Sequence, residues 1–434
     1  MFGLYGLLLR LAWAVVLPYQ IVIARLTGQP GPILAERLVR DTRPAKARGG
    51  GFWVHGVSVG EVRLALLLIA GLRARAPGRS IHLSTCTRTG RALAEEAMRS
   101  DHPGRPDSVA DLPLDLPGPI GRLLDRLDPA ALVLIETELW PNLIRISGGR
   151  SVSVFVVNGR ISKRSLPRFR WIRPLLAQAL PAARLFVMQS EGDAGRLLSL
   201  GAPADKVMVA GNLKFDLPLP PAEPAVVRRR IGASREETIL VAGSTAPGEV
   251  DAILAAFTAL RLVVPASRLV LAPRHPEDLE AARQALRRAG LRAASWSALP
   301  AAGGAAPPSP VPTYDALLID VLGVLPEVYA AATLAFVGGS LVPRGGQNLL
   351  EPAALGTPVL FGPHVENFRA AADALQAEGG GFMARDADHL ASLVRRLARD
   401  PEARRAAGER ARRVVEANRG ALARTLDLLA EAHA

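Results

Sequence analysis

From Gly51 onward, short apolar runs alternate with amphipathic stretches that have the period of a helix. The first run, Phe52 to His55, predicts a strand, and Val62 to Arg75 predicts the helix that follows it. A strand at Ser80 to Thr85 and a helix at Gly90 to Arg99 continue the series, and further strands are expected at 132–135, 153–157 and 185–188. Strands interleaved with helices indicate βα units and a parallel sheet.

The alternation stops at the proline-rich stretch Phe215 to Pro221, which we interpret as a hinge, and then begins again. The second series has a helix at Gly248 to Leu262 and strands at 238–242, 268–272, 316–319, 334–337 and 359–361. The Gly/Ala/Pro-rich insert Leu299 to Pro312 predicts a mobile loop, and Pro401 to Ala434 has a continuously helical pattern.

We therefore expect an α/β protein with two Rossmann-like domains, residues 28–217 and 218–434, the last helix being free to pack back on the first domain. Two doubly wound domains joined by a hinge leave a cleft between the carboxyl ends of their sheets, where such folds bind ligands.

The N-terminal segment, residues 2–24, is apolar apart from Arg10, Tyr19, Gln20 and a few glycines, with Pro18 inside it. A spanning helix needs ~20 mostly apolar residues, so this segment is just long enough. No basic residue precedes it and no cleavage site follows, which argues against a secretory signal. The basic residues that follow are Arg25, Arg37, Arg40, Arg43, Lys46 and Arg48.

By the positive-inside rule, this basic stretch places the rest of the chain on the cytoplasmic side of a membrane. We expect residues 1–27 to anchor the protein as a membrane helix, with spanning favoured over the alternative of a helix lying in the interface. In that alternative, Arg10 extends to the headgroups.

The amino-acid composition limits the classes of partner that the protein is expected to bind. Of 434 residues, 49% are hydrophobic, so buried cores are expected, and the single cysteine, Cys86, excludes an internal disulfide framework. The formal net charge is +13, carried by arginines, with only four lysines. Because no aromatic-interleaved basic stripe or reader motif accompanies this charge, we expect no nucleic-acid partner. Membrane lipids and phosphorylated substrates suit a diffuse positive field better.

Carboxylates follow two strands of the first half. In His55-Gly56-Val57-Ser58-Val59-Gly60-Glu61, Glu61 comes where the helix begins, and there it could accept a proton from a hydroxyl or simply face the helix dipole. Glu136 and Glu138 come directly after the strand ending at Ile135, and capping of the next helix, with Pro141 in its first turn, is their alternative role.

Two cations complete this half. Arg160, after the strand ending at Val157, offers a guanidinium for a carboxylate or a phosphate. Lys214, a rare lysine in an arginine-rich chain, lies next to the hinge, and its alternative reading is a solvated surface lysine.

The second half has features suited to a nucleotide. Ser244 and Thr245 follow one strand, and Arg274 follows another. The strand ending at Val337 leads into a loop with Gly345 and Gly346, and then into a helix expected near Asn348, whose N-terminus would hold a phosphate. Glu351 could accept hydrogen bonds from ribose hydroxyls. Asp386 and Asp388 are explained by helix capping, and His275 and His364 lack ligand-spaced partners, so we expect no metal.

Together these segments resemble the 3-deoxy-D-manno-octulosonic acid (Kdo) transferases of lipopolysaccharide assembly. The motifs that carry the resemblance occur in family order: HGVSVGE, TCTRTG, ETELWPNLI, NGRIS, GNLKFD, AGSTAPGE, APRHP and FVGGSLVPRGGQNLLEPAALGTPVLFGPH. With the N-terminal helix, they cover nearly the whole chain. The resemblance implies the GT-B architecture and an inverting transfer of Kdo from CMP-Kdo to a lipid A precursor, without a cofactor.

The resemblance also implies roles. Glu61 is similar to the family's general base, and Glu136 and Lys214 match positions that stabilise the transition state. The positions that match CMP contacts are Pro273, Arg274, Leu322, Gly323, Val324, Asn348, Leu349, Leu350 and Glu351, with Ser58, Arg160, Ser244, Thr245, Glu327, Gly345 and Gly346 as additional candidates.

Two positions depart from the family pattern. Val324 stands where the family usually has a glutamate, and Glu327 lies one helical turn away as a substitute. Ala246 stands where the family often has a histidine. The alternatives are a GT-B enzyme that uses another nucleotide sugar, a sugar-nucleotide epimerase, and a membrane-tethered binding protein without activity.

Overall fold

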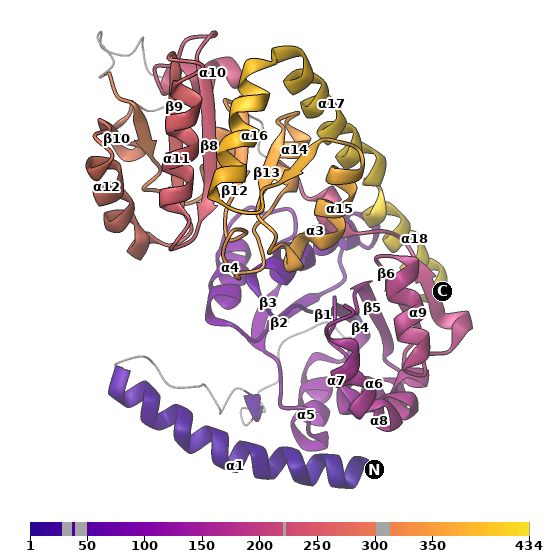
Figure 1. The fold of residues 1–434 in the computed structure, drawn as a ribbon. Coiled ribbons are helices and arrows are strands. Elements are labelled where there is room, and N and C mark those ends of the chain that lie inside the picture. Colours follow the sequence, from indigo (N-terminus) through magenta and orange to yellow (C-terminus); the bar gives the residue numbers. More distant parts are fainter. Residues whose placement is uncertain (28–36, 40–49, 220–222, 301–312, 434) are drawn as a thin grey trace. The chain divides into compact units, whose positions relative to one another are not determined.

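The computed structural model describes residues 1–27, 37–39, 50–219, 223–300 and 313–433. The chain forms two compact units: Met1–Leu217 together with Arg419–Ala434, and Pro218–Asn418. Each unit contains one seven-stranded sheet with helices on both faces (Figure 1).

The sheet of the first unit is parallel throughout, with strand order β3-β2-β1-β4-β5-β6-β7. Its strands are β1 (Gly51–His55), β2 (Ile81–Thr85), β3 (Ser108–Asp111), β4 (Pro129–Ile135), β5 (Ser153–Gly159), β6 (Leu185–Met188) and β7 (Val207–Val209). Its helices are α1 (Phe2–Thr27), α3 (Val59–Arg75), α4 (Arg88–Arg99), α5 (Pro117–Leu127), α6 (Pro141–Gly149), α7 (Leu166–Trp171), α8 (Arg173–Ala179), α9 (Glu191–Ser199) and α18 (Ala421–His433).

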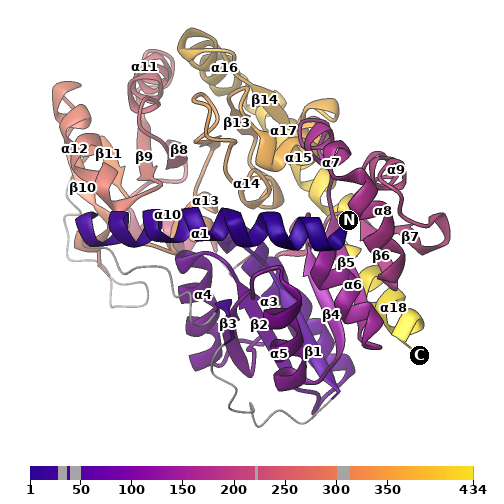
Figure 2. The ribbon, with the colours of Figure 1, turned by 90° about the horizontal axis from the view of Figure 1, so that it is seen from below.

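Alternate residues of the central strands point to opposite faces of this sheet, and both faces are buried. Val133 of β4 belongs to one core with α3, α4 and α18, whereas Leu132 and Leu134 belong to the other core with α5, α6, α8 and α9. The C-terminal helix α18 thus packs beside β5 and β6 of the first sheet (Figure 2).

The second unit repeats this plan, with parallel strand order β10-β11-β9-β8-β12-β13-β14. Its strands are β8 (Thr238–Thr245), β9 (Ser267–Pro273), β10 (Ala293–Ser295), β11 (Ala316–Leu318), β12 (Leu334–Val337), β13 (Val359–Phe361) and β14 (Gly381–Met383). Its helices are α10 (Pro224–Arg230), α11 (Val250–Arg261), α12 (Leu279–Arg288), α13 (Leu325–Tyr329), α14 (Leu350–Ala354), α15 (Arg369–Ala377), α16 (Ala387–Arg399) and α17 (Pro401–Asn418).

The strands and helices expected from the sequence are confirmed to within a few residues. The prediction of one continuous helix from Pro401 to Ala434 is wrong. This stretch is broken into α17 and α18 at Arg419 and Gly420, where Gly420 has φ +89°. Four short strands, β3, β7, β10 and β14, were not expected. Residues 301–312 of the predicted loop and 220–222 at the predicted hinge lie outside the described residues.

Helix α1 packs one side of its N-terminal half against the first unit. The Tyr5 hydroxyl donates to Asp115 Oδ2 at 2.8 Å, and the guanidinium of Arg145 lies 4.4 Å from the ring centroid of Phe2. Within the described ranges, no helix is both long and apolar enough to span a bilayer. The spanning helix expected at residues 1–27 is therefore not found, since Arg10, Pro18 and Gln20 interrupt the apolar sequence. The expected basic residues Arg40, Arg43, Lys46 and Arg48 lie outside the described residues.

Candidate active site

The predicted catalytic carboxylates of the first unit come after neighbouring strands. Glu61 follows β1 and Glu136 follows β4, and these two strands pair in the middle of the sheet. The chain runs outward from β1 through β2 and β3 on one side, and from β4 through β7 on the other. Ligands of doubly wound folds bind at this point of reversal, outside the carboxyl ends of the strands.

The Glu61 carboxylate is held in place at the start of α3. The backbone N–H of Val57 donates to Oε2 at 2.7 Å, and the Ser58 hydroxyl donates to Oε1 at 3.2 Å. Gly56 suits this turn, because a Cβ there would make a tight contact of 3.0 Å with the backbone carbonyl of Glu61. The Val57 carbonyl in turn accepts from the hydroxyls of Thr85 and Thr87, which fixes the turn to the next strand.

The environment of Glu61 favours its protonated form. Burial, together with the negative charges of Glu136 and Glu138, raises the pKa of Glu61 to about 7, despite the lowering effect of the bonds from Val57 and Ser58. A carboxylate that only capped the helix would have a lowered pKa, because N–H donors favour its charged form. Near neutral pH, Glu61 can therefore accept and release a proton.

Glu136 forms an ion pair with Lys214. Lys214 Nζ lies 2.8 Å from Glu136 Oε1, and both side chains are only 13% exposed. The pair excludes the alternative of a solvated lysine. Glu136 itself has φ +62°, in the left-handed region that costs a residue other than glycine ~1–3 kcal/mol. Such backbone strain is concentrated at functional sites.

Asn158, which the sequence reasoning missed, positions Lys214. This fully buried residue at the end of β5 also has a left-handed backbone, φ +56°. Its Oδ1 accepts the backbone N–H of Leu213 at 2.9 Å, and Leu213 begins the short 3-10 helix Leu213–Asp216 that carries Lys214. Asn158 is the first residue of the NGRIS motif, in which the sequence analysis considers only Arg160.

Neither Glu136 nor Glu138 caps α6, because Asp115 does so from another part of the chain. Asp115 accepts the N–H groups of Asn142 at 3.2 Å and Leu143 at 2.8 Å. Glu138 instead accepts the Trp140 indole N–H at 2.5 Å, with the buried His55 Nε2 3.7 Å away. Both glutamates are thus available to the site, while Pro141 begins α6 as expected.

The backbone of Arg160 contacts the loop that carries Glu136 and Glu138. Its carbonyl accepts the Thr137 hydroxyl at 2.6 Å, which ties the loop after β5 to the loop after β4. The first unit therefore brings Ser58, Glu61, Glu136, Arg160 and Lys214 to the carboxyl ends of β1, β4 and β5.

The organising residue of the second unit is Glu249, which the sequence reasoning also missed. Its carboxylate is fully buried and accepts four backbone N–H groups: Ala246 at 2.7 Å, Gly339 at 2.7 Å, Ser340 at 2.9 Å and Leu341 at 2.9 Å. Glu249 thereby joins the loop after β8 to the glycine-rich loop after β12, and these two strands pair at the point of reversal of the second sheet.

The predicted nucleotide residues surround this junction. Ser244 has φ +53°, and Thr245 accepts the backbone N–H of Arg274 at 2.9 Å, so Pro273 and Arg274 lie beside the loop after β8. Gly338 is required here, because a Cβ would lie 2.5 Å from the Ser244 carbonyl oxygen.

The glycine-rich loop leads to α14. Gly345 and Gly346 have φ +85° and +74°, a conformation that glycine tolerates best. Asn348 caps the helix, with its Oδ1 accepting the N–H of Leu350 at 3.1 Å, and its Nδ2 donates to Glu351 Oε1 at 3.0 Å. Leu349 and Leu350 are buried, so only their backbone is available to a ligand.

The segment from Leu322 to Glu327 leads into α13, which packs beside β8 and α14. Leu322 is 80% exposed, Gly323 has φ +88°, and Val324 precedes the first turn of α13. Glu327, the expected substitute, lies 3.6 Å from Arg230, and Arg230 stacks on the Trp296 ring at 4.1 Å. The role of Glu327 as a substitute for the family's glutamate stays a prediction.

Among the described residues, no three His, Cys, Asp or Glu side chains cluster as metal ligands. Asp386 caps α16 as expected, accepting the N–H of His389 at 2.8 Å.

Comparison with known proteins relates both units to one family. Residues 33–217 match the family model for 3-deoxy-D-manno-octulosonic-acid transferase (kdotransferase). The chain is 39% identical over 380 residues to a 3-deoxy-D-manno-octulosonic acid transferase of Bordetella pertussis, covering 87% of this chain and 86% of the relative. A protein of the same name from Haemophilus influenzae is 34% identical over 387 residues, covering 87% and 86%. A solved glycosyltransferase from Rickettsia africae has a TM-score of 0.57 at 12% identity, covering 89% of this chain and 99% of that structure, and shares the fold.

Proposed function

Because the chain belongs to the Kdo transferase family and is a glycosyltransferase, we propose that it moves Kdo from CMP-Kdo to a hydroxyl of a lipid A precursor, with Glu61 as general base. The observation that carries the proposal is the placement of a carboxylate with a pKa of about 7 beside a buried Glu136–Lys214 pair.

In the proposed reaction the acceptor hydroxyl attacks the anomeric carbon of Kdo as the bond from that carbon to the phosphate oxygen breaks. The electrons of that bond leave with CMP, the hydroxyl proton goes to Glu61, and a single displacement inverts the anomeric centre. Glu136 makes Glu61 a stronger base by its charge, and Lys214 offsets developing negative charge nearby.

The second unit is proposed to hold the CMP group. Its candidate phosphate ligands are Arg274, the hydroxyls of Ser244 and Thr245, and backbone N–H groups of the glycine-rich loop. Glu249 keeps the loops after β8 and β12 together, so donors from both can face one ligand. Glu351 remains a candidate for the ribose hydroxyls, oriented by Asn348.

We also propose that α1 lies on the surface of the inner membrane. Phe2, Tyr5 and Trp13 contact the first unit or are partly buried, whereas Leu4, Leu8, Leu11 and Val15 are exposed along the opposite side. Exposed apolar residues at helical spacing beside Arg10 suit a lipid interface. Replacing Leu8 and Leu11 by Glu should release the protein from anionic vesicles in a flotation assay, and unchanged flotation would contradict this placement.

The test of the reaction is to incubate purified protein with CMP-Kdo and tetraacylated lipid A precursor, then measure CMP release and the mass of the lipid product. We expect CMP and a lipid heavier by one or more Kdo residues. Release of another nucleotide from a different sugar donor would favour a GT-B enzyme that uses that donor, and no transfer from any donor would favour an epimerase or a binding protein without activity.

A matched control separates catalysis from helix capping. Glu61→Gln should lose activity, whereas Glu191→Gln, which changes another first-turn glutamate, exposed on α9, should not.

A further inference from the structure

A second polar site lies in the second unit, at the end of the sheet opposite to the proposed nucleotide site. A cavity of about 300 Å³ there is lined by residues that include Arg228, Arg235, Arg404 and Arg405. It also includes Thr238, the first residue of β8, and Pro358, the residue before β13, so it lies at the amino ends of the strands.

This cavity is separate from the proposed nucleotide site. Strand β8 runs from Thr238, at the cavity, to Thr245, in the loop that Glu249 organises. At about 3.3 Å per residue the two ends are about 23 Å apart. Neither the proposed donor nor the proposed acceptor accounts for four arginines at this end.

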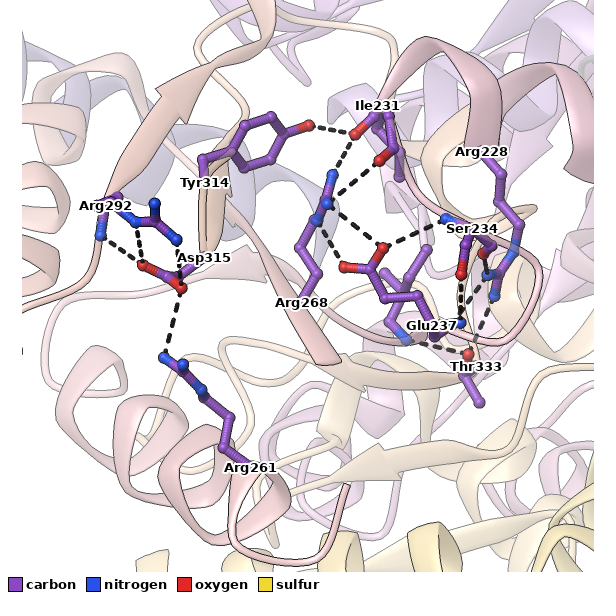
Figure 3. Close-up of polar contacts among 12 residues, drawn as sticks. Arg228, Ile231, Ser234, Glu237, Arg261, Arg268, Arg292, Tyr314, Asp315 and Thr333 are labelled. Atoms are coloured by element: carbon purple, nitrogen blue, oxygen red, sulfur yellow. Dashed lines mark hydrogen bonds and ion pairs between the residues drawn. The ribbon is translucent and has the colours of Figure 1, made fainter. Parts of the chain in front are cut away.

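The first of the arginines is fixed in place by neutral acceptors. Arg228 Nη1 donates to the carbonyls of Ser234 at 2.8 Å and Glu237 at 2.9 Å, and Nη2 donates to the Thr333 hydroxyl at 3.2 Å (Figure 3). These bonds orient the guanidinium without cancelling its charge. Because its geometry is set before any ligand arrives, binding costs little side-chain entropy.

Arg404 is held in the same way. It donates to the carbonyls of Leu397 at 3.2 Å and Ala398 at 3.3 Å, at the end of α16. The next residue, Arg405, donates to the Pro401 carbonyl at 3.3 Å. Burial lowers the pKa of Arg404, and the charge of Arg405 lowers it further, so these two cations are crowded.

The carboxylates at the cavity only partly offset this charge. Glu237 is engaged by Arg268 at 2.9 Å, on the side away from Arg228 (Figure 3). Glu236 is exposed at the rim. Four arginines and two glutamates therefore line the cavity, and Arg268 engages one of the two glutamates, Glu237.

We propose that this cavity is a binding site for a phosphate-bearing anion of about the size of a diphosphate. Guanidinium groups bind phosphate oxygens through paired, charge-assisted N–H bonds, and four arginines line this cavity. The volume is at the lower end of the range for small-ligand pockets, about 300–1,000 Å³. The phosphate group can come from a soluble metabolite or from the headgroup of an anionic lipid.

The test uses the full chain and inorganic pyrophosphate as the probe, measured by calorimetry with saturating CMP present to fill the nucleotide site. Arg235 and Arg405 are exposed, so the double variant Arg235→Gln/Arg405→Gln should fold normally, which its melting temperature checks. Arg395→Gln/Arg399→Gln removes the same charge from exposed positions of α16 and is the control. We expect the double variant to bind pyrophosphate at least about tenfold more weakly than wild type and control.

The second arm measures flotation with phosphatidylcholine vesicles that contain or lack phosphatidic acid. Selective loss of pyrophosphate binding in the double variant indicates a soluble ligand. Selective loss of binding to phosphatidic acid vesicles indicates a lipid headgroup. If the double variant equals the control in both arms, or the wild type binds neither probe, the site is refuted.

Discussion

Glu61 and Glu249 are glutamates at equivalent positions of the two units, but their environments differ. Each lies at the start of the helix that follows a strand at which the strand order of its sheet reverses. That strand is β1 for Glu61 and β8 for Glu249. Glu249 is fully buried and receives four backbone N–H bonds, so its oxygens are occupied. Glu61 receives one such bond and one from a hydroxyl, and is partly exposed. The two carboxylates thus differ in the number of donors that hold them, four for Glu249 and two for Glu61.

Ser58 tunes the proposed base. Its hydroxyl bond lowers the pKa of Glu61, so Ser58→Ala should raise that pKa above its value of about 7. The rising limb of the plot of log kcat/KM against pH should therefore shift to higher pH, with the plateau rate largely kept. Ser190→Ala, at the cap of α9, is the control, and a limb that stays in place would show that Glu61 does not set it.

The same pKa shift has a consequence for stability. The native state binds the Glu61 proton more tightly than the unfolded chain, since its pKa of about 7 exceeds the ordinary 4.5. The contribution of Glu61 to the free energy of unfolding is therefore full below pH ~4.5 and is lost as the pH rises through about 7.

Variants of the buried Glu136–Lys214 ion pair distinguish a structural role of Lys214 from a catalytic one. Lys214→Met leaves the Glu136 carboxylate buried without its partner, and should lower the free energy of unfolding by ~3–5 kcal/mol. Lys214→Met/Glu136→Gln removes both charges and should recover much of that stability in chemical denaturation. If Lys214 stabilises the transition state, the double variant stays as inactive as the single one. Recovery of activity together with stability would reduce Lys214 to a structural role.

At the scale of elements, the strands with a continuous apolar run could be predicted closely. The runs at 185–188, 334–337 and 359–361 have the same bounds in the structure, because both faces of these strands are buried. The short strands β3, β7 and β10 could not, since each has only three or four residues and none of these is fully buried. The break at Gly420 was readable in principle, because glycine ends many helices.

The site was predictable only where a motif follows a strand directly. Glu61, Glu136 and Lys214 stand out in the sequence, whereas the partners of Glu249 lie about ninety residues further on, and nothing local signals them. The available clue was repetition: strand, small-residue turn and Gly-Glu occur in both HGVSVGE and AGSTAPGE.

Glu249→Ala tests the junction between the loops after β8 and β12. Four N–H groups would lose their acceptor, so we expect lower thermal stability and a KM for CMP-Kdo raised at least ~tenfold. Glu249→Gln keeps acceptor capacity on one oxygen and should be intermediate in KM. A variant with lower melting temperature but unchanged KM would show that the junction supports the fold without shaping the nucleotide site.

At the scale of the molecule, the first unit is completed by the end of the chain. Asp216 accepts the N–H groups of Gly420 and Leu422 at 2.7 Å each, and Leu426 and Leu429 of α18 enter the core shared with α3. Gly71 of α3 makes room for this contact, since a Cβ there would lie 2.4 Å from Leu426 Cδ1. A chain that leaves the first unit for about two hundred residues thus returns to stabilise it.

Leu426→Ala should therefore destabilise the first unit by ~2–5 kcal/mol through the cavity it leaves. In a Trp296→Phe background the remaining tryptophans, including the buried Trp53, all belong to the first unit, so tryptophan fluorescence during chemical denaturation reports on this unit. Leu428→Ala, on the less buried side of the same helix, is the matched control. Equal stability of the two variants would contradict the packing of α18.

The most direct measurement is the pH dependence of kcat/KM for Kdo transfer by wild type and Glu61→Gln. With Glu61 as the base, the wild-type rate rises tenfold per pH unit below about 7 and levels off above it. The variant loses that limb and at least ~3 kcal/mol of transition-state stabilisation, more than a hundredfold in rate. A Glu61→Gln enzyme with near wild-type turnover and the same rising limb would contradict the assignment of the base.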